Sequence, residues 1–418
     1  MERIKEILNK KVTELVLFLI LFFMLEFEYM NFVNLPFFQE KMGFAFEFVW
    51  WKYIIVKLIL AALLLLNINL NKFNFFVNSI FLIFLTFPLL IMYEFMPGTP
   101  VIISLFAVLF HTLYWWMSLY EIKVNIKDYK INKKYSLYTL LAVTLLMLIP
   151  FLKTFGFKIN TDALMFNNIY KIREIASLKS TVMMSYFLNW LIKILIPVGI
   201  IMSYKQRKFV FMGVFVLFQI YLFSTGAHKS AFFSLFVILL MFLPSYRYQI
   251  RFVLFTFVIL IIASKIISLV TNDLMAESIV VRRTFFLPAI IVNDYFDFFK
   301  DNHIYLSHSI LKSFIEYPYD LQPEQIISVE YFNSHTGHCN SGFISDGFMN
   351  FGYTGVILNI IGLLAVFKIM EIIKIPHLYA GVLLIIIYTF ISSYFLTSLL
   401  THGVILFIIL AFFILRTD

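Results

Sequence analysis

The sequence predicts an all-α integral membrane protein that crosses the bilayer about twelve times, and three observations indicate this fold class. Apolar residues make up 61% of the 418 residues, against about 45–50% in a soluble domain. Charged residues make up only 14%, where about 25% is usual. The apolar residues also form runs close to the ~20 residues that a helix needs to cross the hydrocarbon core. These features exclude a soluble enzyme.

Charged and turn-forming residues divide the apolar sequence into the expected spans. The first span lacks the small-residue cleavage site of a signal peptide, so we expect it to be retained. The division near Thr401 and His402 is the least defined, because residues 378 to 415 fit two short helices or one long tilted helix. The expected spans cover residues 12 to 30, 46 to 70, 74 to 96, 100 to 121, 135 to 156, 183 to 203, 209 to 225, 229 to 243, 252 to 271, 348 to 368, 378 to 397 and 401 to 416.

The distribution of Lys and Arg predicts that both termini lie in the cytoplasm. The chain has 33 Lys and Arg against 24 Asp and Glu. Loops on the side that holds both termini contain about 18 Lys and Arg, whereas the short loops on the opposite side contain only Lys41 and Lys229. Short cytoplasmic loops carry such an excess. The basic balance therefore reports orientation in the membrane, and we expect no nucleic-acid partner.

Two longer segments are expected outside the cytoplasm, residues 157 to 182 and residues 273 to 347. They divide the chain into nine spans within residues 1 to 272, a large external loop at 273 to 347, and three spans within 348 to 418. Binding and catalytic residues are often found in such loops. The single cysteine, Cys339, cannot form a disulfide within the chain.

Basic side chains in the external segments favour an anionic ligand. The alternative is contact with lipid headgroups, toward which Lys and Arg extend at helix ends. The adjacent Arg282 and Arg283 fit a diphosphate, because each planar guanidinium donates two parallel hydrogen bonds and stays charged. The apolar residues 284 to 299 are expected to lie in the membrane interface. The basic residues are Lys158, Lys171, Arg173, Lys179, Arg282, Arg283, Lys300 and Lys312.

The turn STGAHKS, residues 224 to 230, precedes a short expected span. Lys229 then lies in the first turn of a helix, whose free N–H groups and dipole attract anions. Two interpretations are open: an anion site at Lys229, or a helix cap formed by Ser224 or Thr225.

The densest polar cluster of the chain, residues 331 to 357, precedes the tenth expected span. It contains His335, His338 and Asp346 together with five glycines. The glycines argue against a helix that would bring both histidines onto one metal, and no Glu lies between them, so we expect no metal. The three side chains are candidate proton acceptors. Solvated loop histidines and an N-cap role for Asp346 are the alternatives.

These features resemble the O-antigen and capsule repeat-unit polymerases, the Wzy family, within the superfamily that includes the O-antigen ligases. The TGAHKS turn, residues 225 to 230, is similar to the Thr-Gly-x-(Arg/Lys)-Ser turns of these proteins. The segment HCNSGFISDGFMNFGYTGVI, residues 338 to 357, is similar to the family's His-Asn-Ser start followed by a Phe-Gly-x-x-Gly entry into the next span.

The resemblance implies a C-type membrane glycosyltransferase of the bacterial inner membrane that uses no metal, cofactor or nucleotide sugar. Its substrates would be undecaprenyl-diphosphate-linked oligosaccharides, and a chain-length-regulating co-polymerase is an implied partner alongside membrane lipids. Carried over to this chain, Arg282 or Arg283 and Lys229 hold the diphosphate, and His338 lies beside the acceptor hydroxyl. We group Arg173 with the diphosphate ligands. The alternatives are an O-antigen ligase and a polytopic transporter or lipid-linked glycan flippase, although no internal repeat of the kind common in transporters is visible.

Overall fold

The computed structural model describes residues 2–122, 133–165, 167–227 and 229–415. Within these residues the chain is 78% helix and has no strand, which confirms the predicted all-α fold class. Ten helices of this part of the chain are long and apolar enough to cross a membrane. Two further apolar helices, Ala231–Phe242 and His377–Ser392, are shorter. The chain is therefore a polytopic membrane protein in which ten of the expected spans reach crossing length.

The spans lie close to their expected positions. The long apolar helices are Lys11–Val33, Trp50–Ile68, Lys72–Phe95, Val101–Ser118, Tyr135–Phe155, Val182–Lys205, Phe209–Gly226, Tyr246–Thr271, Phe343–Ile373 and Phe395–Leu415.

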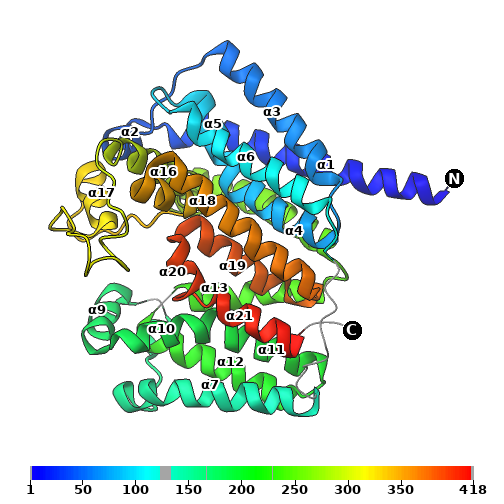
Figure 1. Ribbon diagram of the computed structural model, residues 1–418, viewed down its shortest axis with the longest axis vertical. Helices are drawn as coiled ribbons and strands as arrows, with labels where there is room; N and C mark the ends of the chain where they lie inside the picture. Colours follow the sequence, from blue (N-terminus) through cyan, green and yellow to red (C-terminus); the bar gives the residue numbers. More distant parts are fainter. Residues whose placement is uncertain (1, 123–132, 166, 228, 416–418) are drawn as a thin grey trace. The chain divides into compact units, whose positions relative to one another are not determined.

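The helices form two compact units, each assembled from separate stretches of the chain (Figure 1). Unit 1 comprises residues 1–121, 246–368 and 390–395, and unit 2 comprises residues 122–245, 369–389 and 396–418. Unit 1 contains α1 (Glu2–Glu28), η1 (Tyr29–Val33), α2 (Pro36–Met42), α3 (Trp50–Ile68), α4 (Lys72–Phe81), η2 (Leu82–Thr86), α5 (Phe87–Phe95), α6 (Val101–Ser118), α14 (Tyr246–Thr271), α15 (Met275–Glu277), η5 (Ser278–Phe286), α16 (Leu287–Phe298), α17 (Pro323–Phe332) and most of α18 (Phe343–Ile373).

Unit 2 takes its helices from the middle and the end of the chain. It contains α7 (Lys133–Phe155), α8 (Thr161–Leu164), α9 (Ile169–Lys179), α10 (Val182–Trp190), η3 (Leu191–Leu195), α11 (Ile196–Lys205), α12 (Phe209–Gly226), α13 (Lys229–Ile238), η4 (Leu239–Phe242), η6 (His377–Tyr379), most of α19 (Ala380–Ser392), most of α20 (Phe395–Leu399), α21 (Val404–Leu410) and η7 (Ala411–Leu415).

The centre of unit 1 is the continuous segment α4–η2–α5, whose apolar window is wholly buried. Its sequence is mostly apolar around the helix, and its few polar side chains are buried as well, which is typical of a helix in the interior. Phe75 and Phe87 of this segment pack edge-to-face against Phe18 of α1, with ring centroids 6.5 and 6.3 Å apart. This is a favoured geometry for aromatic pairs. The high Phe content of the chain thus builds a packed core.

Helix α18 is a hairpin with two arms, residues 343–350 and 353–373. Between them the backbone leaves helical geometry at Phe351 (φ −140°, ψ 21°) and Gly352 (φ 61°, ψ −148°). Asn359 Nδ2 donates to the carbonyl oxygen of Phe343 at 2.9 Å, although residues sixteen apart in a continuous helix lie about 24 Å from each other. The long arm includes most of the expected tenth span, and the short arm is a reversed helix that the sequence analysis did not predict.

Glycines allow the hairpin to close. A Cβ on Gly347 would lie 2.6 Å from the backbone carbonyl carbon of Gly355, so no larger side chain fits between the arms. Gly352 adopts a backbone conformation that is almost restricted to glycine. The carbonyl oxygen of Met349, freed by the turn, accepts the N–H of Ile304 at 2.9 Å. The turn is therefore hydrogen-bonded as well as sterically permitted.

The last two apolar helices divide at a different place from the one expected. Helix α19 ends at Ser392 and the final span begins at Phe395, whereas the expected boundary lay at residues 398 to 400. Thr401 and His402 instead interrupt the final span, between α20 and α21. Gly403, with φ of 81°, supports this interruption. The backbone at this interruption also has a side-chain partner, because Trp190 Nε1 donates to the carbonyl oxygen of Leu400 at 2.8 Å.

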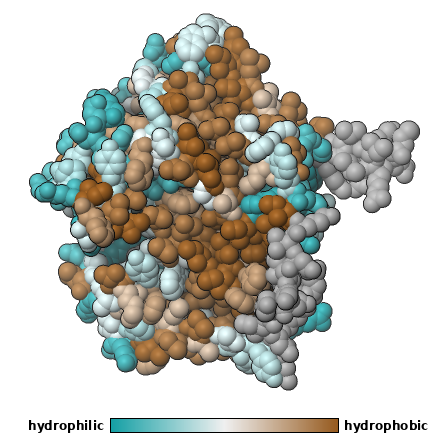
Figure 2. All heavy atoms as spheres, in the orientation of Figure 1, coloured by the Kyte–Doolittle hydropathy of each residue, from teal (hydrophilic) through white to brown (hydrophobic). Residues whose placement is uncertain are grey.

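Large apolar side chains are exposed on the span helices of both units. Examples are Leu58 and Leu65 on α3, Leu146 on α7 and Val210 on α12. Figure 2 shows apolar atoms over α18 and hydrophilic atoms around α17. Exposed apolar surface on helices of crossing length is what a lipid environment requires.

Candidate functional site

A pocket of about 470 Å³ lies in unit 1 at the turn of the α18 hairpin. Phe348 and Tyr353, on the two sides of the turn, form part of its wall. Other walls come from the end of α2, the turn between α5 and α6, α16 and α17. The polar side chains in the wall are Thr99, Asn293, Asp294, Asp297, Lys300 and Tyr331.

Two adjacent residues of α16 line this pocket and carry side-chain oxygen atoms that accept no hydrogen bond within the described residues. Asp294 and Asn293 are each 8% exposed. Asp294 Oδ2 and Asn293 Oδ1 are buried and accept no hydrogen bond from any residue that the structure describes. Buried polar atoms normally have a partner. Burial, and then the charge of Asp297, raise the pKa of the Asp294 carboxyl to about 8.

The rim of the pocket carries a satisfied carboxylate. Asp297 accepts hydrogen bonds from Lys300 Nζ at 3.0 Å and from the Tyr331 hydroxyl at 2.8 Å. These two bonds lower the pKa of Asp297, and the bond that Lys300 donates to Asp297 raises the pKa of Lys300. Two carboxyl groups three residues apart therefore have opposite properties: Asp297 is ionised at the surface, and Asp294 holds its proton near neutral pH.

Arg282 lies next to the pocket on η5, with its side chain buried and 4% of the residue exposed. Its Nε and Nη2 donate to Ser278 Oγ at 3.0 and 2.7 Å, and its Nη1 lies 2.9 Å from Met42 Sδ. Met42 also lines the pocket. No carboxylate among the described residues pairs with this guanidinium. Burial, and then Arg283, lower the pKa of Arg282 to about 10, so it stays charged at neutral pH.

The structure separates the two adjacent arginines that the sequence groups together. Arg283 is exposed, whereas Arg282 is buried and its guanidinium lies 4.7 Å from the centre of the Phe38 ring. Only Arg282 is therefore placed beside the pocket. The following segment, expected in the membrane interface, forms α16, which is buried within unit 1 from Ala289 to Phe296.

The candidate proton acceptors of the polar cluster lie in two different environments. His335 and His338 are exposed in the segment between α17 and α18. Asp346 is buried in the short arm of α18, where its carboxylate accepts the N–H of Phe395 at 2.8 Å and the Asn350 amide at 2.9 Å. It therefore binds the start of α20 instead of capping α18. A catalytic role for the three side chains stays a prediction.

Arg173 and the turn of residues 224–230 come together in unit 2. Arg173 Nε and Nη2 donate to the carbonyl oxygen of Ala227 at 3.2 and 3.0 Å. Ala227 ends α12 in a left-handed conformation. The hydroxyls of Ser224 and Thr225 donate back into α12, to Tyr221 O and Leu222 O. Helix α13 begins at Lys229, and the side chain of Lys229 lies outside the part of the chain that the structure describes.

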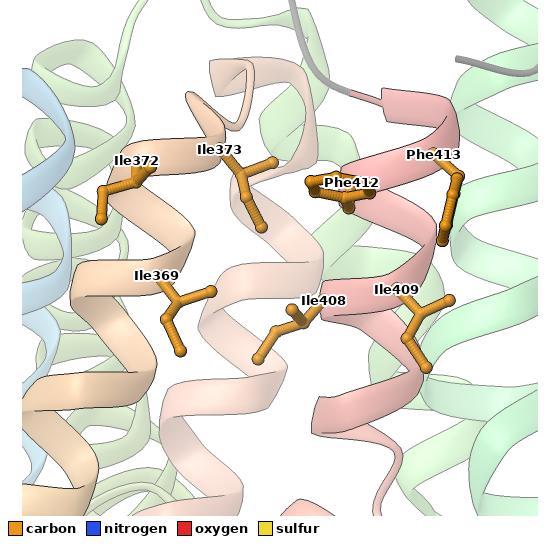
Figure 3. A pocket seen from close by; sticks show the side chains of 7 residues that line it. All are labelled: Ile369, Ile372, Ile373, Ile408, Ile409, Phe412 and Phe413. Atoms are coloured by element: carbon orange, nitrogen blue, oxygen red, sulfur yellow. The ribbon is translucent and has the colours of Figure 1, made fainter. Parts of the chain in front are cut away.

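A second pocket, of about 400 Å³, lies in unit 2 and has no polar group in its lining. Figure 3 shows three isoleucines of α18, at positions 369, 372 and 373, opposite Ile408, Ile409, Phe412 and Phe413 of α21 and η7. Such a lining suits an acyl chain and cannot supply a catalytic group.

Sequence reasoning missed Asp294 and Asn293. The signal was the pair Asp294 and Asp297 in a strongly apolar segment, spaced to lie on one helical face. Among the residues that the structure describes, no three His, Cys, Asp or Glu side chains are arranged to hold a metal ion. No protein-family model, no curated protein and no solved structure matches the chain.

Proposed function

We propose that the chain is a membrane glycosyltransferase that joins undecaprenyl-diphosphate-linked oligosaccharide repeat units into O-antigen or capsular polysaccharide. The transfer takes place in blocks at the outer face of the bacterial inner membrane, with both termini in the cytoplasm. One observation carries the proposal: unpartnered oxygen acceptors in the wall of the α18 pocket, which suit sugar hydroxyls, lie near a buried guanidinium that has no carboxylate partner among the described residues, which suits a diphosphate. This guanidinium, of Arg282, lies beside the pocket and contacts Met42 of its wall.

The reaction needs three contributions from the protein. The acceptor hydroxyl attacks the anomeric carbon and loses its proton, while the bond from that carbon to the diphosphate oxygen breaks and the lipid diphosphate leaves with the electron pair. Arg282 stabilises the charge that grows on the leaving group, most effectively where water is excluded. Asp294 is the proton acceptor in the pocket and acts in its ionised form, a minor but strongly basic fraction near neutral pH, because a pKa near the working pH suits this role. His338, His335 and Asp346 are the other candidates.

The remaining expected ligands complete the proposal. Arg283, Lys229 and Arg173 stay candidate diphosphate ligands on the basis of the resemblance, each with a smaller expected contribution than Arg282, and no metal is required. A chain-length-regulating co-polymerase is the proposed protein partner. An O-antigen ligase, which transfers glycan to lipid A-core, uses the same donor chemistry and differs in its acceptor.

A lipid-linked glycan flippase or another transporter is the second candidate, and two observations favour it. Helix α18 and the final span are both interrupted, at residues 351–352 and 400–403. Lysines 57, 193 and 265 lie within apolar helices. Discontinuous helices and charged residues within spans are typical of transporters.

Incubation of the purified chain in lipid with lipid-linked repeat units distinguishes these functions. We expect a ladder of products on a gel, unchanged by excess chelator. Arg282→Ala combined with Arg283→Ala should abolish the ladder while the helix content stays intact. Substrate that never lengthens would refute polymerisation. Movement of a fluorescent lipid-linked glycan across vesicles, without lengthening, would support the flippase.

A further inference from the structure

Helix α1 carries two glutamates that each share a single lysine with a second carboxylate. The first group consists of Glu26 of α1, Glu94 of α5 and Lys57 of α3. Lys57 Nζ lies 2.7 and 2.9 Å from the two carboxylate oxygens of Glu94 and also contacts Glu26. Both carboxylates are buried, with side chains 0% and 5% exposed. We call this group the Lys57 triad.

The second group lies on another face of α1. Lys265 of α14 lies 2.7 Å from Glu277 Oε1 of α15 and 3.7 Å from Glu28 Oε2. Glu28 is buried, and its Oε2 accepts no hydrogen bond from the described residues. We call this group the Lys265 triad. A pocket of about 410 Å³, lined by Lys265 and Glu277, adjoins it.

Charge counting gives each triad one carboxylate too many. In each triad two carboxylates face one ammonium. The rings next to the two ammonium groups are uncharged: Phe22 and Tyr53 lie near Lys57, and Phe32 lies near Lys265. Two carboxylates that contact one nitrogen cannot both stay ionised in a low-dielectric site without a large cost. A proton on one carboxyl removes the excess charge.

A third group on α1 provides the contrast. Glu14 contacts both Arg247 and Arg251 of α14, the latter at 3.0 Å, and its side chain is fully buried. One carboxylate therefore faces two guanidinium groups. Two cations beside one carboxylate leave no second negative charge to be neutralised there. The same helix thus carries one carboxylate that contacts two cations and two carboxylates that each share one cation with a further carboxylate.

We propose that the Lys57 triad and the Lys265 triad are proton-binding sites, each of which holds one proton shared by its two carboxyl groups at neutral pH. The proton comes from water and resides on a carboxyl oxygen, so each triad is electrically neutral. The packing of α1 against its neighbours is then coupled to the uptake and release of two protons. This inference stands independently of the proposed function.

Infrared spectroscopy of the full chain in liposomes tests the proposal through the C=O absorption of protonated carboxylic acids at neutral pH. Glu26→Gln leaves Glu94 ionised beside Lys57 and should remove one carboxyl from this absorption. Glu94→Gln should remove the same amount, and the double variant should lose no more than either single variant, because only one proton is shared. Glu28→Gln and Glu277→Gln should behave in the same way.

The matched control is Glu14→Gln on the same helix, which should leave this absorption unchanged. Thermal unfolding gives the second measurement. Glu26→Gln should keep the wild-type midpoint, whereas Glu14→Gln should lower it, because Arg247 and Arg251 lose the buried carboxylate that they share. The proposal is overturned if the Glu26 and Glu28 variants lose no absorption, if the losses of the single variants add in the double variant, or if Glu26→Gln is as unstable as Glu14→Gln.

Discussion

Replacing Asp294 by Asn should change how the stability of the protein depends on pH. Burial raises the pKa of Asp294 to about 8 in the folded protein, from an ordinary value of 3.8. Between these values the folded chain keeps a proton that the unfolded chain has lost. The stabilising contribution is therefore complete below the unfolded pKa and is lost as the pH rises to about 8.

The size of the effect follows from this one-proton difference. Each pH unit in this window costs about 1.4 kcal/mol of unfolding free energy, so the wild-type chain should lose about 3 kcal/mol relative to Asp294→Asn between about pH 5 and pH 7. Contributions of other groups cancel when the two profiles are subtracted. Denaturant titration in detergent micelles at a series of pH values measures the difference.

Asp297→Asn is the matched control. This carboxylate lies three residues away, is exposed, and has a lowered pKa because Lys300 and Tyr331 donate to it. Its stabilising contribution is lost only at acidic pH, below the window, so its profile should run parallel to the wild-type one from about pH 5 to pH 7. If the Asp294→Asn profile also ran parallel to the wild-type profile from about pH 5 to pH 7, Asp294 would not carry a proton in the folded protein over this range. Its proposed role as a proton acceptor with a raised pKa would then be wrong.

Three further substitutions test the site. Arg282→Ala alone should slow polymer formation by roughly 10²-fold or more, whereas Arg283→Ala should have little effect. Equal losses in the gel assay would contradict the assignment of the main diphosphate contact to the buried Arg282. Gly352→Ala should lower the unfolding free energy by about 1–3 kcal/mol because of its backbone conformation, while Gly213→Ala, which meets open space within a helix, should be neutral or stabilising. Asp346→Ala should cost about 1–3 kcal/mol because the N–H of Phe395 loses its acceptor, and an unchanged thermal midpoint would contradict its structural role.

Much of the fold could be predicted because hydropathy alone identifies apolar helices. Hydropathy cannot identify a reversal inside an apolar segment, so the α18 hairpin was missed. Its cause is local: Gly352 permits the turn, and Gly347 and Gly355 permit the contact between the arms. The boundary before Phe395 was missed for a related reason, since it depends on a hydrogen bond to Asp346, far away in the sequence.

The site was predictable in composition but not in geometry. The cluster of cationic residues near Arg282 was visible, yet two adjacent arginines look equivalent in a sequence. Only the packing of η5 against α2 shows that Arg282 is buried beside Met42 while Arg283 is exposed. Asp294 was hidden in an apolar segment, and its importance follows from a missing donor, which no sequence pattern reports.

The contact between Gly347 and Gly355 has a practical implication for mapping the site. Phe348 and Tyr353 line the pocket from opposite arms of α18, so the distance between the arms sets the width of the pocket. A mutational scan restricted to pocket-lining side chains would overlook both glycines, which contribute no side chain at all. Replacing either by alanine should push the arms apart and change the width of the pocket, even though every side chain that lines the pocket remains in place.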